Sequence, residues 1–478
     1  MKRNKIPSLA LSLFFLLIVL ATFPIIPING RKHQNKKTNS HKHHKDKSGK
    51  RDIAIGSVYT PSPARAPPLP YYGPYPTRSN IFDVLSFGAK GDGVADDSKP
   101  LLAAWEAACK VSGATVEIPS EFKFLIKPIT LQGPCMPHIV LQIDGNLLAP
   151  PLQIGSWPKS SNLLQWINFK WIHSFTIQGS GTIDGQGSEW WSKSQIYYIQ
   201  ENSKHTPYMK PTALRFYASF NVTVRDIKII NSPQCHLKFD NSGGVKVINI
   251  TISSPENSPN TDGIHLQNTQ NVEIQHSNIA CGDDCVSIQT GCSNVHVHHI
   301  ICGPGHGISL GALGRDKSVA CVSDIIIENI LMQNTLYGVR IKTWQGGIGS
   351  VKNVSFSTIQ VSHVKVPITI DQYYCDKNIC KNQTEAVEIS GVKFDQIIGT
   401  YCVHPIYIAC SNDIPCTNVD LIDIQLKPSF GYGGNQQALC WNSYGKSQAP
   451  LSPSSIDYCL RRGSGSVQRI DKSHDNVC

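Results

Sequence analysis

Residues 260–309 read NTDGIHLQNTQNVEIQHSNIACGDDCVSIQTGCSNVHVHHIICGPGHGIS, and the spacing of the polar clusters within this stretch decides the fold. Asp283 follows Asp262 by 21 residues, and His306 follows Asp284 by 22. A step of this length is about one coil of a stacked β-solenoid. Because neighbouring strands of a ladder lie about 4.8 Å apart, residues one coil apart are expected to stack on one another.

Short strands with apolar–polar–apolar alternation recur around this stretch. Their first residues are separated by 23, 27, 23, 30 and 29 positions: Val222, Val245, Val272, Val295, Ile325 and Val354. Asn or Gly punctuates the corners between them. A parallel β-helix predicts this pattern. A β-sandwich or a propeller is the alternative, but a propeller blade needs about 40–45 residues, which these steps do not match. We therefore expect an all-β fold, a single parallel β-helix.

One helix is expected outside the strand repeats. Ser98 to Val111 has apolar residues at helical spacing, and Gly113 follows as a stop signal. We expect this helix to cap the open end of the solenoid, which otherwise exposes backbone donors and acceptors. The folded domain is expected to span residues 80–478. One domain of that length is possible because a repeat fold grows along a single axis.

The amino terminus predicts entry into the secretory pathway. Lys2, Arg3 and Lys5 precede the apolar run Leu9–Phe23, which is the order of a signal peptide over residues 1–29. Further isoleucines extend this run toward the length of a membrane span, about 20 residues. No small-x-small cleavage site follows, so an uncleaved signal-anchor stays open. Either reading predicts a secreted, extracellular protein.

Residues 30–79 form a basic and proline-rich segment. Residues 1–79 carry a formal charge of +12, which leaves −2 for residues 80–478. Residues 30–51 are rich in Lys and His, and residues 59–77 are rich in Pro, a composition that predicts disorder. We expect this tail to bind an anionic polymer, because polybasic blocks attract anions. The secretory signal argues against nucleic acid as a partner.

The cysteine count agrees with an oxidising compartment. All sixteen cysteines lie between Cys109 and Cys478, and an even number in a secreted chain implies a disulfide framework. Four N-glycosylation acceptors also fit secretion: Asn221, Asn249, Asn353 and Asn382.

Each polar cluster alone has an ordinary structural explanation. Asn-Thr-Asp-Gly is a common turn, and a histidine between two glycines fits a tight corner. Asp283 and Asp284 would point to opposite faces of a strand, so both reach one cleft only if the chain bends at Gly282. The clusters nevertheless occur in order at coil spacing. Together with Arg340 and Lys342 they predict one face with three carboxylates, an imidazole, a guanidinium and an ammonium.

A zinc site is the competing interpretation of the histidines. Five of them lie close together in the sequence: His265, His276, His296, His298 and His299. Zinc needs three or four converging ligands, whereas strand alternation sends His298 and His299 to opposite faces. We therefore expect no metal ion.

Four motifs resemble the signatures of the polygalacturonases, glycoside hydrolase family 28. They are Asn260-Thr-Asp-Gly-Ile-His265, Gly282-Asp-Asp-Cys285, Gly303-Pro-Gly-His-Gly-Ile-Ser309 and Arg340-Ile-Lys-Thr-Trp344. The segment from Asp83 to Gly93 resembles the start of the plant members. The resemblance implies a right-handed parallel β-helix, a monomer, and inverting hydrolysis of α-1,4-linked galacturonate in pectin within the cell wall. It implies no required metal or cofactor.

The resemblance also implies residue roles. Asp283 becomes the general acid, Asp262 and Asp284 activate the water, and His306 helps to hold the proton of the acid. Four residues are expected to bind the substrate, the two cations among them through its carboxylates: Asn260, Arg340, Lys342 and Tyr374. Tyr373 beside Tyr374 leaves that last choice open. Cys285 and Cys302 lie 17 residues apart, nearly one coil, and the resemblance suggests the same disulfide.

The chemistry supports these roles on its own. Inverting hydrolysis needs one protonated and one ionised carboxyl, about 6.5–9.5 Å apart. Carboxylates close together raise the pKa of one of them, so we expect a mildly acidic pH optimum. A rate that climbs steadily from pH 5 to pH 9 would refute this. Two alternatives remain, a calcium-dependent pectate lyase and a non-catalytic pectin-binding solenoid. Cleavage within chains or from their ends, methyl-ester tolerance and decorated substrates stay open.

Overall fold

The computed structural model describes residues 80–152, 157, 165–192, 210–375, 380, 383, 385–431, 437–461 and 477–478. These residues belong to one compact unit, Pro76–Cys478. The predictions for residues 1–29 and 30–79, and the acceptor Asn382, lie outside the described residues. Within the described ranges, none of the helices combines the length and apolarity needed to cross a bilayer.

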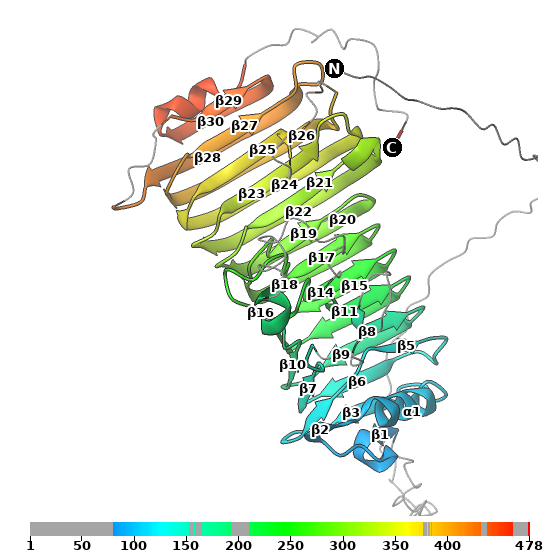
Figure 1. Ribbon diagram of the computed structural model, residues 1–478. Coiled ribbons are helices and arrows are strands. Elements are labelled where there is room, and N and C mark those ends of the chain that lie inside the picture. Colours follow the sequence, from blue (N-terminus) through cyan, green and yellow to red (C-terminus); the bar gives the residue numbers. More distant parts are fainter. Residues whose placement is uncertain are drawn as a thin grey trace, which may run out of the picture. The chain divides into compact units, whose positions relative to one another are not determined.

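The strands stack as successive coils, all in parallel (Figure 1). One face is an eleven-stranded sheet formed by β5 (Ile129–Gln132), β8 (Gln165–Lys170), β11 (Thr212–Tyr217), β14 (Leu237–Asp240), β17 (Ile264–Gln267), β19 (Val286–Ile288), β21 (Ile308–Leu313), β23 (Tyr337–Trp344), β25 (Val366–Tyr374), β27 (Ile406–Ala409) and β29 (Leu439–Trp441). Each strand pairs in parallel with the next one in this order.

The second sheet has nineteen strands in two columns that merge. One column comprises β1 (Ile81–Asp83), β3 (Thr115–Ile118), β6 (Ile139–Ile143), β9 (His173–Gln178), β12 (Phe220–Arg225), β15 (Gly243–Ile248), β18 (Gln270–Ala280), β20 (Cys292–Cys302), β22 (Val319–Gln333), β24 (Ile348–Val364), β26 (Glu388–Tyr401), β28 (Cys416–Pro428) and β30 (Ser443–Ser452). The other comprises β2 (Asp92–Asp96), β4 (Lys123–Leu125), β7 (Asn146–Leu148), β10 (Thr182–Asp184), β13 (Lys228–Ile230) and β16 (Thr251–Ser253). Because β18 pairs with both β15 and β16, one long strand per coil replaces two from β18 onward.

The predicted strand repeats are in register. Val222 pairs with Val245, and the ladder continues through the later repeats to Val354. The residue before each repeat turns a corner with a positive φ between 52° and 65°: Asn221, Gly244, Asn271, Asn294, Asp324 and Asn353. Asn, Asp and Gly tolerate this left-handed conformation best. The predicted parallel β-helix is therefore confirmed, and the Asn and Gly punctuation explains its corners.

The core runs along the axis of the coils, filled by the inward residues of every strand. Phe169, Phe216 and Phe239 stack from coil to coil with ring centroids 4.7 and 4.9 Å apart. Such offset aromatic pairs stabilise by about 0.5–1.5 kcal/mol beyond the burial of their area. The stack holds β8, β11 and β14 in register, on the coils that precede the polar clusters.

The predicted helix forms at the N-terminal end. It is α1 (Ser98–Ala108), three residues shorter than the predicted Ser98–Val111, and it packs against β1, β3 and β5. Trp105 is buried, donates its indole N–H to Gln132 O at 3.1 Å and meets Phe175 edge-on at 5.3 Å. The helix thus covers the first coil, as a cap should. Three short 3-10 helices also lie among the described residues: η1 (Val84–Phe87), η2 (Arg315–Lys317) and η3 (Ser454–Tyr458).

Twelve of the sixteen cysteines form disulfides. The pairs are Cys109–Cys135, Cys285–Cys302, Cys321–Cys478, Cys375–Cys380, Cys410–Cys416 and Cys440–Cys459. The pair named from the sequence, Cys285–Cys302, is among them, with its Cα atoms 6.0 Å apart. The remaining four are thiols, so the framework is smaller than an even count of sixteen implies: Cys235, Cys281, Cys292 and Cys402.

Candidate active site

The polar clusters lie in the turns that lead into β17, β19 and β21. Ile264 pairs with Val286, and Val286 with Ile308. Asp262, Asp284 and His306 each stand two residues before one of these partners, so they occupy equivalent places on three successive coils. The predicted stacking is therefore confirmed. All eight predicted catalytic and substrate-binding residues line a single open cavity of about 400 Å³: Asn260, Asp262, Asp283, Asp284, His306, Arg340, Lys342 and Tyr374.

Two glycines make the turns of this site possible. A Cβ on Gly282 would lie 1.9 Å from the backbone oxygen of Ser258, so only glycine fits there. Gly307 has φ +84°, and a Cβ on it would lie 2.1 Å from Gly338 O. The close approach at Gly282 permits the bend that brings both following carboxyls into the cavity.

Asp284 is a buried carboxylate that three groups hold ionised. Lys342 Nζ lies 3.0 Å from its Oδ2, and Arg340 Nη2 lies 2.9 Å from its Oδ1. The Ser309 hydroxyl donates to the same Oδ1 at 2.8 Å. Burial works to raise the pKa of Asp284, but Lys342, Arg340 and Ser309 outweigh it and keep the pKa below its ordinary value.

The two cations of the motif Arg340-Ile-Lys342 are also fixed by aromatic rings. The Arg340 guanidinium carbon lies 4.1 Å from the centre of the Tyr337 ring, and Arg340 Nε donates to Ser309 Oγ at 3.1 Å. Lys342 Nζ lies 5.6 Å from the centre of the Tyr374 ring. Cation–π contacts of this kind orient the charge without neutralising it. Both cations therefore line the cavity in fixed positions, with Asp284 as their first partner.

Asp283 is more accessible than Asp284, with 18% of its side chain exposed against 3%. His306 Nδ1 lies 3.0 Å from its Oδ1, and Asn260 Nδ2 donates to its Oδ2 at 3.3 Å. The backbone N–H of Asp284 also donates to Asp283 Oδ1, at 2.9 Å. Asp283 is thus oriented by neighbours on two other coils while it still faces the cavity.

Asp262 completes the set of carboxyls. Burial raises its pKa, His265 opposes this through a 3.1 Å contact of its Nδ1 with Oδ2, and the charges of Asp283 and Asp284 add to the rise. The site therefore holds one carboxyl with a raised pKa and one with a lowered pKa. An environment that separates carboxyls in this way lets one keep a proton while another is ionised.

His236 supports Asp262 from the coil before, and sequence reasoning missed it. Its Nδ1 donates to Asp262 O at 2.9 Å, and its Nε2 accepts from the Ser254 hydroxyl at 2.7 Å. Burial lowers the pKa of His236 to about 4, so the ring stays neutral at mildly acidic pH. The only signal was its place 26 residues, about one coil, before Asp262.

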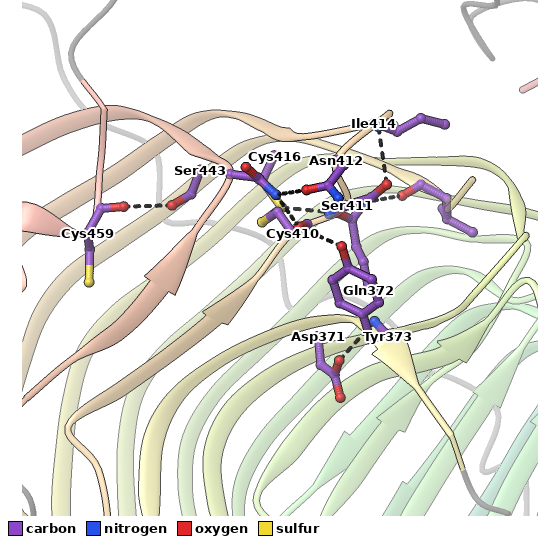
Figure 2. Close-up of a disulfide and its surroundings, with 12 residues drawn as sticks. Asp371, Gln372, Tyr373, Cys410, Ser411, Asn412, Ile414, Cys416, Ser443 and Cys459 are labelled. Carbon is purple, nitrogen blue, oxygen red and sulfur yellow. Dashed lines mark hydrogen bonds between the residues drawn. A yellow bond between two sulfur atoms is a disulfide. The ribbon is translucent and has the colours of Figure 1, made fainter. Parts of the chain in front are cut away.

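Of the two adjacent tyrosines, Tyr374 belongs to the cavity. The Tyr373 hydroxyl instead donates to Cys410 O at 3.3 Å, beside the Cys410–Cys416 disulfide (Figure 2). The choice left open by the sequence thus falls on Tyr374.

The prediction that strand alternation sends His298 and His299 to opposite faces is wrong. His299 stands at a corner with φ +54°, so strand alternation fails there, and its Nδ1 lies 2.8 Å from His298 Nδ1. Among the described residues, however, the one group of three metal-type ligands within 4.8 Å of each other is Asp283, Asp284 and His306. Both oxygens of Asp284 already accept hydrogen bonds from Arg340, Lys342 and Ser309, so this cluster suits a cation poorly.

Comparisons with known proteins show the family of the chain. Glycosyl hydrolases family 28 matches residues 109–449. A probable polygalacturonase of Arabidopsis thaliana is 39% identical over 79% of this chain and 84% of its own length. A polygalacturonase of Cryptomeria japonica is 38% identical over 83% of this chain and 75% of its own. An endo-xylogalacturonan hydrolase of Aspergillus tubingensis shares the fold, with a TM-score of 0.65 and 21% identity over 80% of this chain and 99% of that one.

The family match begins at Cys109, directly after α1, and includes the coils that carry the carboxyls, the histidine and the two cations. The relatives cover most of the same length. The chain belongs to family 28 of the glycosyl hydrolases.

Proposed function

We propose that the chain is a polygalacturonase that hydrolyses the α-1,4-galacturonosidic bonds of pectin by an inverting mechanism. The observation that carries this proposal is a single cavity with three carboxyls on two adjacent turns and two cations on one strand, β23, two coils beyond Asp283 and Asp284. The names of the two relatives, a probable polygalacturonase and a polygalacturonase, support it.

In this mechanism Asp283 donates the proton to the leaving glycosidic oxygen. It is the accessible carboxyl, and His306 and Asn260 orient it. Asp284 acts as the ionised partner that activates water, because Lys342 and Arg340 keep its pKa low. Asp262 lines the same cavity and is assigned, with Asp284, to the attacking water.

Arg340 and Lys342 then serve two purposes. Each donates one hydrogen bond to Asp284, and Arg340 Nε donates a further one to Ser309. A guanidinium has five N–H donors and an ammonium has three, so both retain donors for a substrate carboxylate. Asp284 supplies one negative charge against these two positive charges, so a substrate carboxylate would balance the second positive charge and a neutral sugar would not. The cations therefore favour a galacturonate unit next to the carboxyls.

A calcium-dependent lyase fits these contacts less well. Calcium takes 6–8 oxygen ligands, whereas Asp284 is bound to two cations and a hydroxyl. A lyase also needs a free base to abstract a proton, and the two basic residues of the cavity are paired with that carboxylate. Hydrolysis uses the same residues without disturbing these pairs.

The place of action is part of the proposal. The predicted signal over residues 1–29 supports secretion to the plant cell wall, and the charge of residues 30–79 supports binding to an anionic wall polymer. Retention on de-esterified pectin should weaken steeply as salt rises, because exposed charges are screened within about 8–10 Å. A chain without residues 30–79 that is retained equally well would contradict the role of the tail.

The reaction type can be tested directly. The protein is incubated with polygalacturonate at pH 5, with and without a calcium chelator, and the products are followed by proton NMR and by ultraviolet absorbance. Hydrolysis predicts new reducing ends of inverted anomeric configuration that persist with the chelator and show no unsaturated product. Unsaturated products that vanish with the chelator would establish a lyase instead, and retained configuration would overturn the inverting assignment. Oligomer length separates internal from terminal cleavage.

A further inference from the structure

The outward face of the eleven-stranded sheet continues beyond the catalytic coils in both directions. Leu214, Leu237 and Ile264 point into the core, so the residues that follow them point outward. One outward row runs through Arg215, Lys238, His265, Ser287, Ser309, Arg340, Thr369, Tyr407 and Leu439. Coils of one strand spacing, about 4.8 Å, place these residues along the path of an extended polymer.

On the N-terminal side of the carboxyls this face is cationic. Arg215 and Lys238 lie on β11 and β14, and Lys170 ends the neighbouring β8. Asp240 binds both Arg215 and Lys238, the latter with its Nζ 3.6 Å away. Three positive charges against one negative charge leave an excess of two. This half of the face suits a carboxylated sugar.

On the C-terminal side of the catalytic coils, the outward face of the sheet is no longer cationic. The row beside Lys342 continues through Asp371 and Ala409 to Trp441. The partner of Arg340 on the next coil is Thr369, followed by Tyr407. Asp371 is therefore the one charged member of these two rows beyond the catalytic cations, among the described residues.

Among the residues that the structure describes, Asp371 forms no ion pair. Its carboxylate accepts the backbone N–H of Tyr373 at 2.9 Å (Figure 2). The neighbouring cations Arg340 and Lys342 donate hydrogen bonds to Asp284 and Ser309 instead. Burial raises the pKa of Asp371 above its ordinary value, and the Tyr373 N–H and the charge of Arg340 oppose that rise. A substrate carboxylate placed here would meet a like charge.

The aromatic residues around Asp371 offer the alternative contact. Tyr407 stands two residues before Ala409, the residue that pairs with Asp371 on the next coil. Burial, and then the charge of Asp371, raise the pKa of Tyr407. Tyr407 meets the Trp441 ring edge-on at 5.5 Å, and 38% of Trp441 is exposed. Aromatic side chains with a polar tip bind apolar sugar faces or a methyl group and hydrogen-bond hydroxyls.

Hydrogen bonds and a disulfide connect the coils beneath this surface. Gln372 accepts the Ser411 N–H at 2.7 Å and donates to Val387 O at 2.8 Å, and the Cys410–Cys416 disulfide closes the adjoining loop (Figure 2). With Tyr373 bound to Cys410 O, the backbone under Asp371 has contacts to the next coil. Asp371 therefore belongs to a preformed surface.

We propose that Asp371, Tyr407 and Trp441 form a subsite for an uncharged sugar unit, so that the protein discriminates the charge of the polymer across the cleavage point. The inference rests on the proposed function. Two sources share this chemistry, a methyl-esterified galacturonate and a neutral sugar such as rhamnose. Repulsion by one partly exposed carboxylate changes kcat/KM by on the order of fivefold.

The test compares kcat/KM on polygalacturonate, on partly methyl-esterified polygalacturonate and on an alternating rhamnose–galacturonate polymer. Asp371→Asn keeps the acceptor for the Tyr373 N–H and removes the charge. This variant should raise kcat/KM on polygalacturonate about fivefold. Its kcat/KM on whichever of the other two polymers the wild type prefers should change less than twofold. Asp420→Asn is the control, because Asp420 lies on β28 in the other sheet. It removes the same charge and should leave kcat/KM on all three polymers unchanged. Whichever of the two other polymers the wild type prefers identifies the source.

If kcat/KM on polygalacturonate, relative to that on the other two polymers, is the same for wild type and Asp371→Asn, the subsite is wrong. The proposed hydrolase function would be unaffected by that result. A wild type that cleaves none of the polymers would overturn the proposed function and the subsite with it. A second measurement needs no variant. Mass spectrometry of wild-type products from partly esterified polymer should find ester groups concentrated at one of the two newly formed ends. Esters distributed equally between both new ends would contradict the subsite even if Asp371→Asn fails to fold.

Discussion

Replacement of Lys342 by Met tests the electrostatic design of the site through protein stability. Lys342 Nζ lies 3.0 Å from Asp284 Oδ2, and both side chains are buried. At an effective dielectric constant of about 20, two unit charges at this distance attract by roughly 5 kcal/mol. Removing one member of a buried pair costs about 3–5 kcal/mol. Because Arg340 remains on the other oxygen, we expect a loss near the lower limit, about 3 kcal/mol at pH 7.

The pH dependence of this loss gives the sharper test. The pKa of Asp284 is lowered in the folded state, because Lys342, Arg340 and Ser309 outweigh burial. Its contribution to stability is therefore present above the ordinary aspartate pKa, about 3.9, and is lost as the pH falls through the folded pKa. The difference between wild type and Lys342→Met should be largest at neutral pH and shrink below about pH 4.

Urea unfolding at pH 7, 5 and 3.5 measures this difference, whatever the variant does to activity. Lys246→Met is the matched control, because Lys246 is exposed and lies 3.9 Å from Glu273. An exposed pair of this kind contributes about 0–1 kcal/mol. A Lys342→Met deficit of equal size at pH 7 and pH 3.5, or one no larger than that of the control, would refute the ionised state of Asp284.

Three further predictions concern other parts of the site. His306→Gln removes the imidazole beside Asp283 and should lower kcat by about a hundredfold with the melting temperature nearly unchanged; kinetics with unaltered kcat would contradict the role of the ring. Cys302→Ser removes the disulfide to Cys285, 17 residues away, and should lower the free energy of unfolding by about 3 kcal/mol. Urea unfolding of variant and wild type without reductant measures this; equal midpoints would show that the bond does not form. Burial lowers the pKa of His236 to about 4, so its contribution to stability is present above its unfolded pKa and lost as the pH falls from about 6.5 to 4, by up to about 3 kcal/mol; His236→Gln should flatten this slope, and an unchanged slope would mean that another group causes it.

The sequence was sufficient for the parts of the fold in which distance along the chain converts directly into distance in space. In a solenoid, one coil of about 22 residues brings Asp262 and Asp284 together, so spacing alone predicts their stacking. The repeats from Val222 to Val354 are in register for the same reason. The Gly282 bend was also predictable, because only a bend brings two adjacent aspartates into one cavity.

Contacts that depend on three-dimensional packing were beyond the sequence. The alternation rule failed at His299, because a left-handed corner resets which face the next side chain takes. His236 carries no motif and is recognisable only once its ring is seen beneath Asp262. Disulfide pairing follows the meeting of loops, so four thiols remain where an even count suggested full pairing. The shorter helix reflects a turn at Cys109, whose disulfide to Cys135 fixes the chain there.

The cations illustrate the difference most clearly. The resemblance implied that Arg340 and Lys342 bind substrate carboxylates. The structure adds that both bind Asp284 first, which makes them part of the machinery that keeps one carboxyl ionised. Their side-chain donors number more than Asp284 can accept, so the two uses are compatible.

The proposed mechanism makes Asp283 the proton donor of a galacturonan hydrolase. Its most direct test is turnover of polygalacturonate at pH 5 by wild type and Asp283→Asn, together with the affinity of each for the same polymer. We predict reducing ends from wild type alone, with Asp283→Asn folded and binding the polymer within a few-fold of wild type. Equal turnover by both proteins, or binding without turnover by both, would contradict the account.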